Sequence, residues 1–218
     1  MSLTESHASR LTRVYLHLDR LSHNMKLLQQ LVGSRPLWPC IKANAYGHGA
    51  EFIVGHLKQI GYDTFCVADI GEAAALMESG LDATFIVLSA MLPEHSQAIV
   101  EYGCQPVVCK REMVEILARD AKKLGKPVSI HIKVDTGMGR IGIRPDEVQG
   151  FLEYCLSYPL IRVRGIMSHF PRADEADKTY SHRQITAFKS VAGSCETSKI
   201  EAFHMANSAA IFDLPDSY

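Results

Sequence analysis

The sequence predicts an α/β protein built as a TIM-type (β/α)8 barrel that is incomplete at its C-terminal end. Short runs rich in β-branched and aromatic residues alternate with longer runs of helical spacing, the pattern of repeated βα units around a parallel sheet. Polar and glycine-rich segments follow several of the apolar runs directly, and barrel enzymes carry their functional side chains at that end of each strand. The length of 218 residues fits one large domain.

Seven runs have the length and apolar character of strands in such a sheet. A complete barrel needs an eighth strand, and the chain reaches Tyr218 before a plausible one appears. An open doubly wound sheet would also accept seven strands, so periodicity alone leaves both architectures open. The placement of polar motifs just after the strands favours the barrel. The predicted strands cover residues 38–42, 64–69, 84–89, 105–109, 128–135, 162–168 and 201–206.

Stretches with helical spacing connect these strands. Pro93 and Pro145 each open one of them, since proline is favoured in the first turn of a helix. The segment 13–19 alternates like a half-exposed strand and need not belong to the barrel. We therefore expect a flexible tail over residues 1–12 and one barrel domain over residues 13–218. The predicted helices cover residues 19–32, 50–60, 71–79, 93–102, 111–124, 145–156 and about 176–195.

The composition argues against several classes of protein. Hydrophobic residues make up 47% of the chain, charged residues 22%, and the formal net charge is −1, without the basic excess of a nucleic-acid binder. We see no apolar run of bilayer length and no signal peptide, so no membrane partner is expected. The six cysteines form no CxxC pair and are interpreted as free thiols in a reducing compartment. A cytoplasmic location is the resulting prediction.

Lys42 is the strongest catalytic candidate in the chain. It follows a short apolar run, and a lysine at the end of a buried strand must be desolvated, hydrogen-bonded or neutralised. Such a lysine can form a Schiff base with an aldehyde, for which pyridoxal 5'-phosphate is the commonest cofactor. The alternative is a lysine that reaches the surface from a strand end. The hydroxyl of Tyr46 and the tight turns allowed by Gly47 and Gly49 favour a phosphate site beside the lysine.

Four segments carry a resemblance to a known family. The run Lys42–Gly49, KANAYGHG, resembles the lysine signature of alanine racemase, a pyridoxal-phosphate enzyme with an N-terminal barrel and a C-terminal β-domain. The run Lys133–Gly142, KVDTGMGRIG, resembles the second signature of that family. Ser168–Phe170 and His204–Ala210 resemble the third and fourth. The resemblance extends from about Arg13 to the last residue and implies a homodimer in the full-length enzyme.

The resemblance implies particular roles for the matching residues. Lys42 would hold the cofactor as a Schiff base and act as the base on one face of the substrate α-carbon. Arg140 would contact the phenolic oxygen of the cofactor and the substrate carboxylate, and in many members a lysine matching Lys133 carries a carbamate that pairs with this arginine. Tyr46 and Ser208 would contact the phosphate, and His169 the ring. The implied cofactor-binding residues are Lys42, Tyr46, Arg140, His169, Asn207 and Ser208.

Taken without the resemblance, several of these residues have ordinary interpretations. Asn207 and Ser208 are residue types that commonly cap a helix, and Arg140 could lie on the surface. The histidines show no metal-ligand spacing, so no metal is predicted. Charged residues that open a helix, such as those in 174–177, usually stabilise the helix dipole, and we assign them no chemistry.

The resemblance predicts interconversion of L-alanine and D-alanine, which supplies D-alanine for bacterial peptidoglycan. It also implies that the second base is a tyrosine of the partner's β-domain, and that an arginine facing the pyridine nitrogen follows Tyr218. The chain is therefore expected to be the N-terminal domain of a longer racemase, and to bind cofactor weakly and racemise poorly or not at all by itself. Three alternatives stay open: a single-domain protein that carries pyridoxal phosphate for cofactor homeostasis, an aldolase-type barrel whose lysine attacks the substrate directly, and a racemase for serine or another small amino acid.

Overall fold

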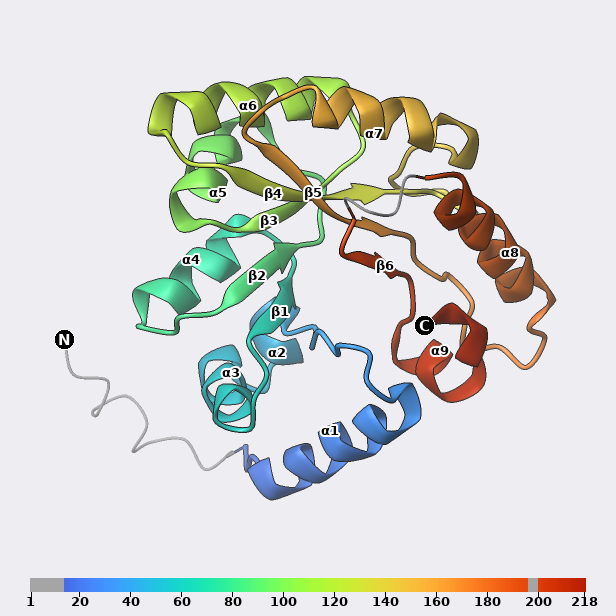
Figure 1. The fold of residues 1–218 in the computed structure, drawn as a ribbon. Helices are drawn as coiled ribbons and strands as arrows, with labels where there is room; N and C mark the ends of the chain where they lie inside the picture. The colour runs from blue at the N-terminus through green and yellow to red at the C-terminus, as the bar shows by residue number, and fades with distance from the viewer. Residues whose placement is uncertain (1–13, 196–199) are drawn as a thin grey trace.

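A single curled sheet of six parallel strands forms the centre of the computed structural model (Figure 1). The structure describes residues 14–195 and 200–218, so the tail predicted at residues 1–12 lies outside the described residues. The strands follow the order β1-β2-β3-β4-β5-β6, and each crossover therefore moves one strand along in the same direction. This order confirms an incomplete barrel, because a doubly wound sheet reverses direction at a switch point. The strands are β1 Thr64–Val67, β2 Thr84–Val87, β3 Gln105–Val108, β4 Val128–Lys133, β5 Ile161–Met167 and β6 Ala202–His204.

The strand predicted at 38–42 is wrong, and the sheet has six strands rather than seven. Only Cys40 pairs there, in an isolated parallel bridge with Cys66 of β1. Two hydrogen bonds form the bridge: Ile41 N donates to Cys66 O at 2.8 Å, and Cys66 N donates to Pro39 O at 2.8 Å. Proline has no N–H to extend the ladder, and the chain turns away directly after the bridge. The segment still lies beside β1, where the first barrel strand was expected.

The helices lie where their spacing predicted them, within a few residues at each end. In Figure 1, α3 to α8 surround the curled sheet, and α1 lies across its open side near α9. Two predicted helices begin with a short 3-10 turn, η1 Pro93–His95 and η2 Pro145–Glu147. The longer helices are α1 Leu18–Val32, α3 Ala50–Gln59, α4 Ile70–Glu78, α5 Ser96–Tyr102, α6 Arg111–Leu124, α7 Val148–Leu156 and α8 Thr179–Ser194; the short ones are α2 Lys42–Tyr46, α9 Ser208–Asp213 and η4 Pro215–Ser217.

The strand-like alternation at 13–19 does not produce a strand in its described part. Val14 and Tyr15 are 73% and 75% exposed, and α1 begins at Leu18. An alternating pattern becomes a strand only where a neighbouring strand pairs with it, and no described strand does so here.

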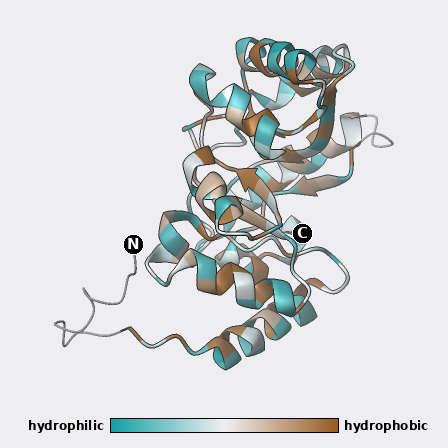
Figure 2. Cartoon of the chain, turned by 90° about the vertical axis from the view of Figure 1, so that its left-hand side faces the viewer, coloured by the Kyte–Doolittle hydropathy of each residue, from teal (hydrophilic) through white to brown (hydrophobic). Residues whose placement is uncertain are grey.

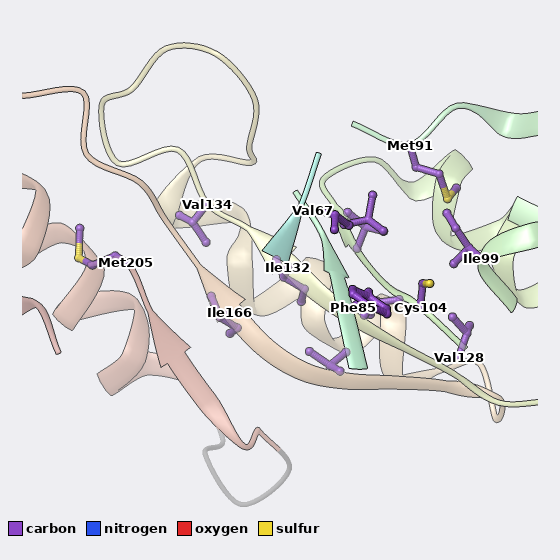
Figure 3. Packing of buried hydrophobic residues seen from close by; sticks show 14 of the residues in the cluster. Val67, Phe85, Met91, Ile99, Cys104, Val128, Ile132, Val134, Ile166 and Met205 are labelled. Atoms are coloured by element: carbon purple, nitrogen blue, oxygen red, sulfur yellow. The ribbon is translucent and has the colours of Figure 1, made fainter. Parts of the chain in front are cut away.

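The core lies on both faces of the sheet. Buried side chains from β1, β2, β4 and β5 pack together in Figure 3, and the rings of Phe65 and Phe85 lie 6.2 Å apart. Figure 2 shows mostly hydrophobic strands, while the helices carry hydrophilic residues on part of their surface. Successive residues of a strand point to opposite faces, so Ile130 and Ile132 of β4 face one way and His131 and Lys133 the other. All four are buried. The His131 and Lys133 face is the interior of the barrel.

Candidate active site

A cavity of about 1050 Å³ lies at the carboxyl ends of the strands. This is the face at which barrel proteins build their sites. Its apolar wall includes Trp38 and Met205, and its polar lining comes from the segment at Lys42 and Tyr46 and from the ends of β4, β5 and β6 with the loops that follow them. The structure brings every predicted site residue to this one cavity: Lys42, Tyr46, Lys133, Arg140, His169, Asn207 and Ser208.

Lys42 is presented by an unusual left-handed turn. The four residues after it, Ala43 to Tyr46, all have φ between 51° and 54°, and hydrogen bonds such as Ala45 N to Ile41 O at 2.7 Å close the turn. Left-handed backbone costs residues with a side chain about 1–2 kcal/mol each. Gly47, at φ 85°, ends the turn without this cost. The strain is consistent with a functional requirement for this backbone.

Replacing Ala43 with glycine should stabilise the protein. Glycine adopts the left-handed conformation freely, and we expect the free energy of unfolding to rise by about 0.5–1 kcal/mol after the entropy of the added flexibility is subtracted. Denaturant unfolding measures the change. The matched control is Ala75→Gly on the exposed side of α4, which should lower the same quantity by about 0.5–1 kcal/mol. If Ala43→Gly and Ala75→Gly changed the free energy of unfolding in the same direction, this would contradict the left-handed turn.

Tyr46 stands close to the lysine. Its hydroxyl donates to Cys40 Sγ at 3.5 Å, and Lys42 Nζ lies 5.9 Å from the centre of its ring. The hydrogen bond to Cys40 and partial burial raise the pKa of Tyr46 to about 12. The phenol therefore stays protonated at neutral pH, and it can donate to a ligand in the cavity by giving up its hydrogen bond to Cys40.

Lys133 is a buried amine that forms no ion pair with any described residue. Its side-chain nitrogen finds no hydrogen-bond partner among the described residues, although the residue is only 3% exposed. Burial and the nearby charge of Arg140 lower the pKa of Lys133 to about 8. Arg140 follows a turn organised by Asp135, whose carboxylate accepts from Gly137 N at 2.8 Å and Gly139 N at 2.9 Å. An unpaired buried amine is costly, so this site fits a negatively charged group.

The pKa of His169 depends on burial and on the cationic side chains around the cavity. Burial, followed by the positive charges of Lys133, Arg140 and Lys42 in that order, lowers the pKa of His169 to about 4. The imidazole is therefore neutral at physiological pH. The positive charges of Lys133 at the end of β4, of Arg140 in the loop after it and of Lys42 act on one ring, which gives the cavity a positive potential suited to an anionic ligand.

Asn207 and Ser208 lie where β6 leads into α9. The side-chain oxygen of Asn207 accepts from Ala210 N at 3.0 Å, so Asn207 is also an ordinary N-cap. Ser208 is the first residue of α9 and lines the cavity. The helix begins here because the cap satisfies its first free N–H groups.

A hydrogen-bonded pair of histidines, the buried His131 and the partly buried His204, is the main feature that sequence reasoning missed. His131 Nδ1 lies 3.0 Å from His204 Nε2, and His131 Nε2 lies 3.0 Å from Gln105 Oε1. If Gln105 accepts, His131 donates to it through Nε2 and accepts from His204 through Nδ1. Burial is the main cause that lowers the pKa of His131 to about 4 and that of His204 well below its usual value. Trp38 packs edge-on against His204 with ring centres 4.7 Å apart.

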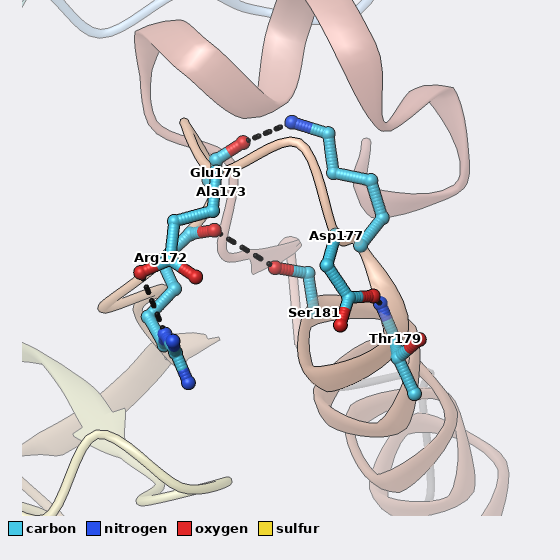
Figure 4. A network of polar contacts seen from close by, with 7 residues as sticks. Arg172, Ala173, Glu175, Asp177, Thr179 and Ser181 are labelled. Atoms are coloured by element: carbon cyan, nitrogen blue, oxygen red, sulfur yellow. Dashed lines mark hydrogen bonds and ion pairs between the residues drawn. The ribbon is translucent and has the colours of Figure 1, made fainter.

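Several charged side chains of the loop before α8 have partners within the loop or in α9. In Figure 4, Arg172 pairs with Glu175 at 2.7 Å, and Thr179 N donates to Asp177 at 2.9 Å. Lys178 donates to Ala173 O at 2.7 Å. These contacts support the structural interpretation of the acidic segment 174–177.

Other expected features can be compared with the structure directly. All six cysteines are free thiols, as predicted. Within residues 14–195 and 200–218, no three His, Cys, Asp or Glu side chains are grouped so that they could hold a metal ion. Of the helices in these same ranges, none has the length and hydrophobicity that a bilayer crossing requires.

Fold and site together define a class: an incomplete parallel βα barrel with a lysine in a positively charged cavity at the carboxyl ends of its strands. Residues 16–218 match the family model described as alanine racemase, N-terminal domain, and the chain belongs to this family. It is 37% identical to an alanine racemase of Clostridium perfringens over 207 residues and 38% identical to one of Clostridium tetani over 204 residues. These matches cover 93% and 92% of this chain but 53% of either relative, so the chain spans about half the length of the curated relatives it matches.

Solved structures agree with this assignment. An alanine racemase of Clostridium difficile 630 superposes with a TM-score of 0.85 at 31% identity, over 92% of this chain and 53% of the other. The alanine racemase of E. faecalis gives 0.87 at 31% identity, over 97% and 58%. A histidine racemase of Leuconostoc mesenteroides shares the fold at 20% identity, with a TM-score of 0.85 over 92% and 54%.

Proposed function

We propose that this chain is the cofactor-binding part of an alanine racemase that uses pyridoxal 5'-phosphate. One observation carries the proposal: Lys42 shares a cavity with Lys133 and Arg140, and the cavity has a positive potential around a neutral His169. The amine of Lys133, which has no hydrogen-bond partner within residues 14–195 and 200–218, fits an anionic occupant. Membership of the alanine racemase family supplies the choice of alanine as substrate.

The residues present fit this cofactor. Lys42 would bind the aldehyde carbon, while Tyr46 and the start of α9 at Ser208 would hold the phosphate through hydroxyl and backbone N–H donors. Arg140 offers a planar set of donors to the cofactor's phenolic oxygen and to the substrate carboxylate. His169, neutral in this cavity, would lie against the ring.

Proton transfer is the chemical role proposed for the chain's own side chains. When bound, pyridoxal 5'-phosphate supplies an electron sink for the charge left at the substrate α-carbon. Lys42 Nζ, once released by the incoming substrate amine, would take the α-proton from one face and return it. Arg140 would orient the carboxylate so that the α-proton faces the lysine. The apolar wall with Trp38 and Met205 would exclude water from that step.

Reductive trapping tests the proposal. The purified chain is incubated with pyridoxal 5'-phosphate, reduced with borohydride and digested, and the modified peptide is located by mass spectrometry. We expect the label at Lys42 and a visible absorbance band before reduction. A label spread evenly over surface lysines would contradict the proposal. An aldolase-type barrel would instead trap a carbonyl substrate at Lys42 without any visible band.

Lys133 should carry a carbamate when bicarbonate is present. Only an uncharged amine adds to carbon dioxide, releasing a proton, and the lowered pKa of Lys133 leaves a large uncharged fraction near pH 8. The resulting anion would pair with Arg140. Native mass spectrometry should show a mass increase that disappears on acidification and in Lys133→Met. An unmodified Lys133 under these conditions would contradict the expectation, and Lys126→Met is the matched surface control.

Two further parts of the proposal follow from the family. A homodimer and a cytoplasmic, D-alanine-supplying role are proposed for the full-length enzyme. A racemase for serine or another small amino acid is the second candidate function, because a hydrophobic pocket discriminates one methylene by only about 1–3 kcal/mol.

A further inference from the structure

Glu72 of α4 joins two backbone segments at the mouth of the cavity. Its Oε1 accepts from Ala43 N at 2.6 Å, and its Oε2 accepts from Ala68 N at 2.7 Å. Ala68 directly follows β1 and lines the cavity, whereas Ala43 directly follows Lys42. Hydrogen bonds from N–H groups to a carboxylate are short and strong. One side chain thus connects the end of β1 to the turn that presents the lysine.

The Glu72 carboxylate does not bond the N–H of the helix cap residue, as it would in a capping box. Asp69 is the N-cap of α4, and its side chain accepts from Glu72 N at 3.1 Å. In a capping box, the glutamate at this third position returns to the N–H of the cap residue itself. Here it bonds Ala68 and Ala43 instead. The helix start therefore fixes the backbone of Glu72 while its carboxylate is left to hold the neighbouring loop.

The bond to Ala43 acts directly on Lys42. Ala43 N belongs to the peptide unit that joins the two residues, so holding this N–H fixes the plane of that peptide and the ψ angle of Lys42. The same N–H lies at the start of the left-handed turn, whose backbone is intrinsically unfavourable and needs outside support. Glu72 is not among the residues that line the cavity.

We propose that Glu72 is a positioning residue that aims Lys42 into the cavity by holding the Lys42–Ala43 peptide. The inference rests on the proposed function of Lys42 as the cofactor-binding lysine. Glu72 acts through the backbone and contacts no reacting atom. Removing one of its two acceptors should release the left-handed turn while α4, still capped by Asp69, stays folded.

The test compares E72Q and E72D with the wild-type chain. The amide of E72Q keeps one acceptor oxygen and turns an N–H donor toward the second backbone N–H, and the shorter E72D cannot span both. We expect both variants to slow reductive trapping of pyridoxal 5'-phosphate at residue 42 by about 10–100-fold, as a misplaced reacting group does. Hydrogen exchange at the Ala43 amide, followed by mass spectrometry, should speed up in the same variants.

The matched control is E147Q. Glu147 also accepts from a backbone N–H, that of Arg144 at 3.1 Å, but lies outside the cavity lining. It should leave both readouts unchanged. Wild-type trapping rates in E72Q, with Ala43 exchange also unchanged, would overturn the inference and leave the proposed function intact. A wild-type chain with no trapping at Lys42 would instead refute the proposed function, and Ala43 exchange in E72Q would still decide whether Glu72 holds the turn.

Discussion

Lys42→Arg should abolish covalent attachment of pyridoxal 5'-phosphate at position 42. Arginine keeps the positive charge of the cavity but stays protonated in proteins, so it offers no uncharged amine to bind an aldehyde. Any exchange of the alanine α-proton for deuterium that the wild-type chain supports should fall by about 10²–10⁴-fold, the usual contribution of a positioned acid–base group. Borohydride trapping with peptide mapping measures the first effect, and proton NMR in deuterated water measures the second.

The control for this substitution is Lys126→Arg. Lys126 Nζ donates to Glu101 O at 3.2 Å on the surface, outside the cavity lining, and the variant should trap cofactor at Lys42 like the wild type. Unfolding by denaturant should show that Lys42→Arg remains folded. Undiminished trapping or α-proton exchange in Lys42→Arg would refute the role assigned to this lysine.

Gly165→Ala should strongly destabilise the barrel. Gly165 of β5 pairs with His131 on one side and Ala202 on the other. A Cβ on Gly165 would collide with the His131 ring, with Nδ1 closest and Cε1 at 2.9 Å, and would approach Ala202 O at 3.2 Å. The imidazole ring of His131 lies directly over Gly165, where its Nδ1 meets His204.

The expected cost combines two effects. Overpacking and a buried polar group without a partner each cost about 1–3 kcal/mol, so we expect a loss of roughly 2–4 kcal/mol in the free energy of unfolding. Denaturant unfolding measures it. Gly150→Ala in α7 is the matched control: its added methyl meets no atom within 4 Å, and it should stabilise the helix by about 0.5–1 kcal/mol.

A second variant separates the collision from other causes. In His131→Ala the ring is absent, so adding Gly165→Ala to it should cost much less than in the wild type. Additive costs in the double variant would contradict the proposed collision. The same comparison tests whether the histidine pair depends on the space that Gly165 provides.

Much of the fold could be predicted from the sequence, because the spacing of apolar residues follows the side of each helix or strand that is buried. The alternation of apolar runs placed six strands and the surrounding helices within a few residues of their observed bounds. It failed at 38–42, where Pro39 limits pairing to one bridge, and at 13–19, where the described residues meet no partner strand. Pairing depends on a neighbouring strand, which a local pattern does not contain.

The sequence predicted the individual residues of the candidate site but not the interactions among them. Contiguous motifs identified Lys42, Arg140 and Ser208, and the D-x-x-E pattern at Asp69 and Glu72 is a visible helix start. No sequence pattern indicated that this glutamate would reach Ala43, because its partner lies 29 residues away in another loop.

By itself, the sequence determined the βα order, the family motifs and the choice of Lys42 as the candidate lysine, since each depends on residues close together in the chain. Only the tertiary structure decided the left-handed turn at Ala43–Tyr46, the Lys133 amine that lacks a partner among the described residues, the neutral His169 and the hydrogen-bonded pair of His131 and His204. These properties arise from burial and from charges on separate loops, and burial and distance exist only once the chain has folded.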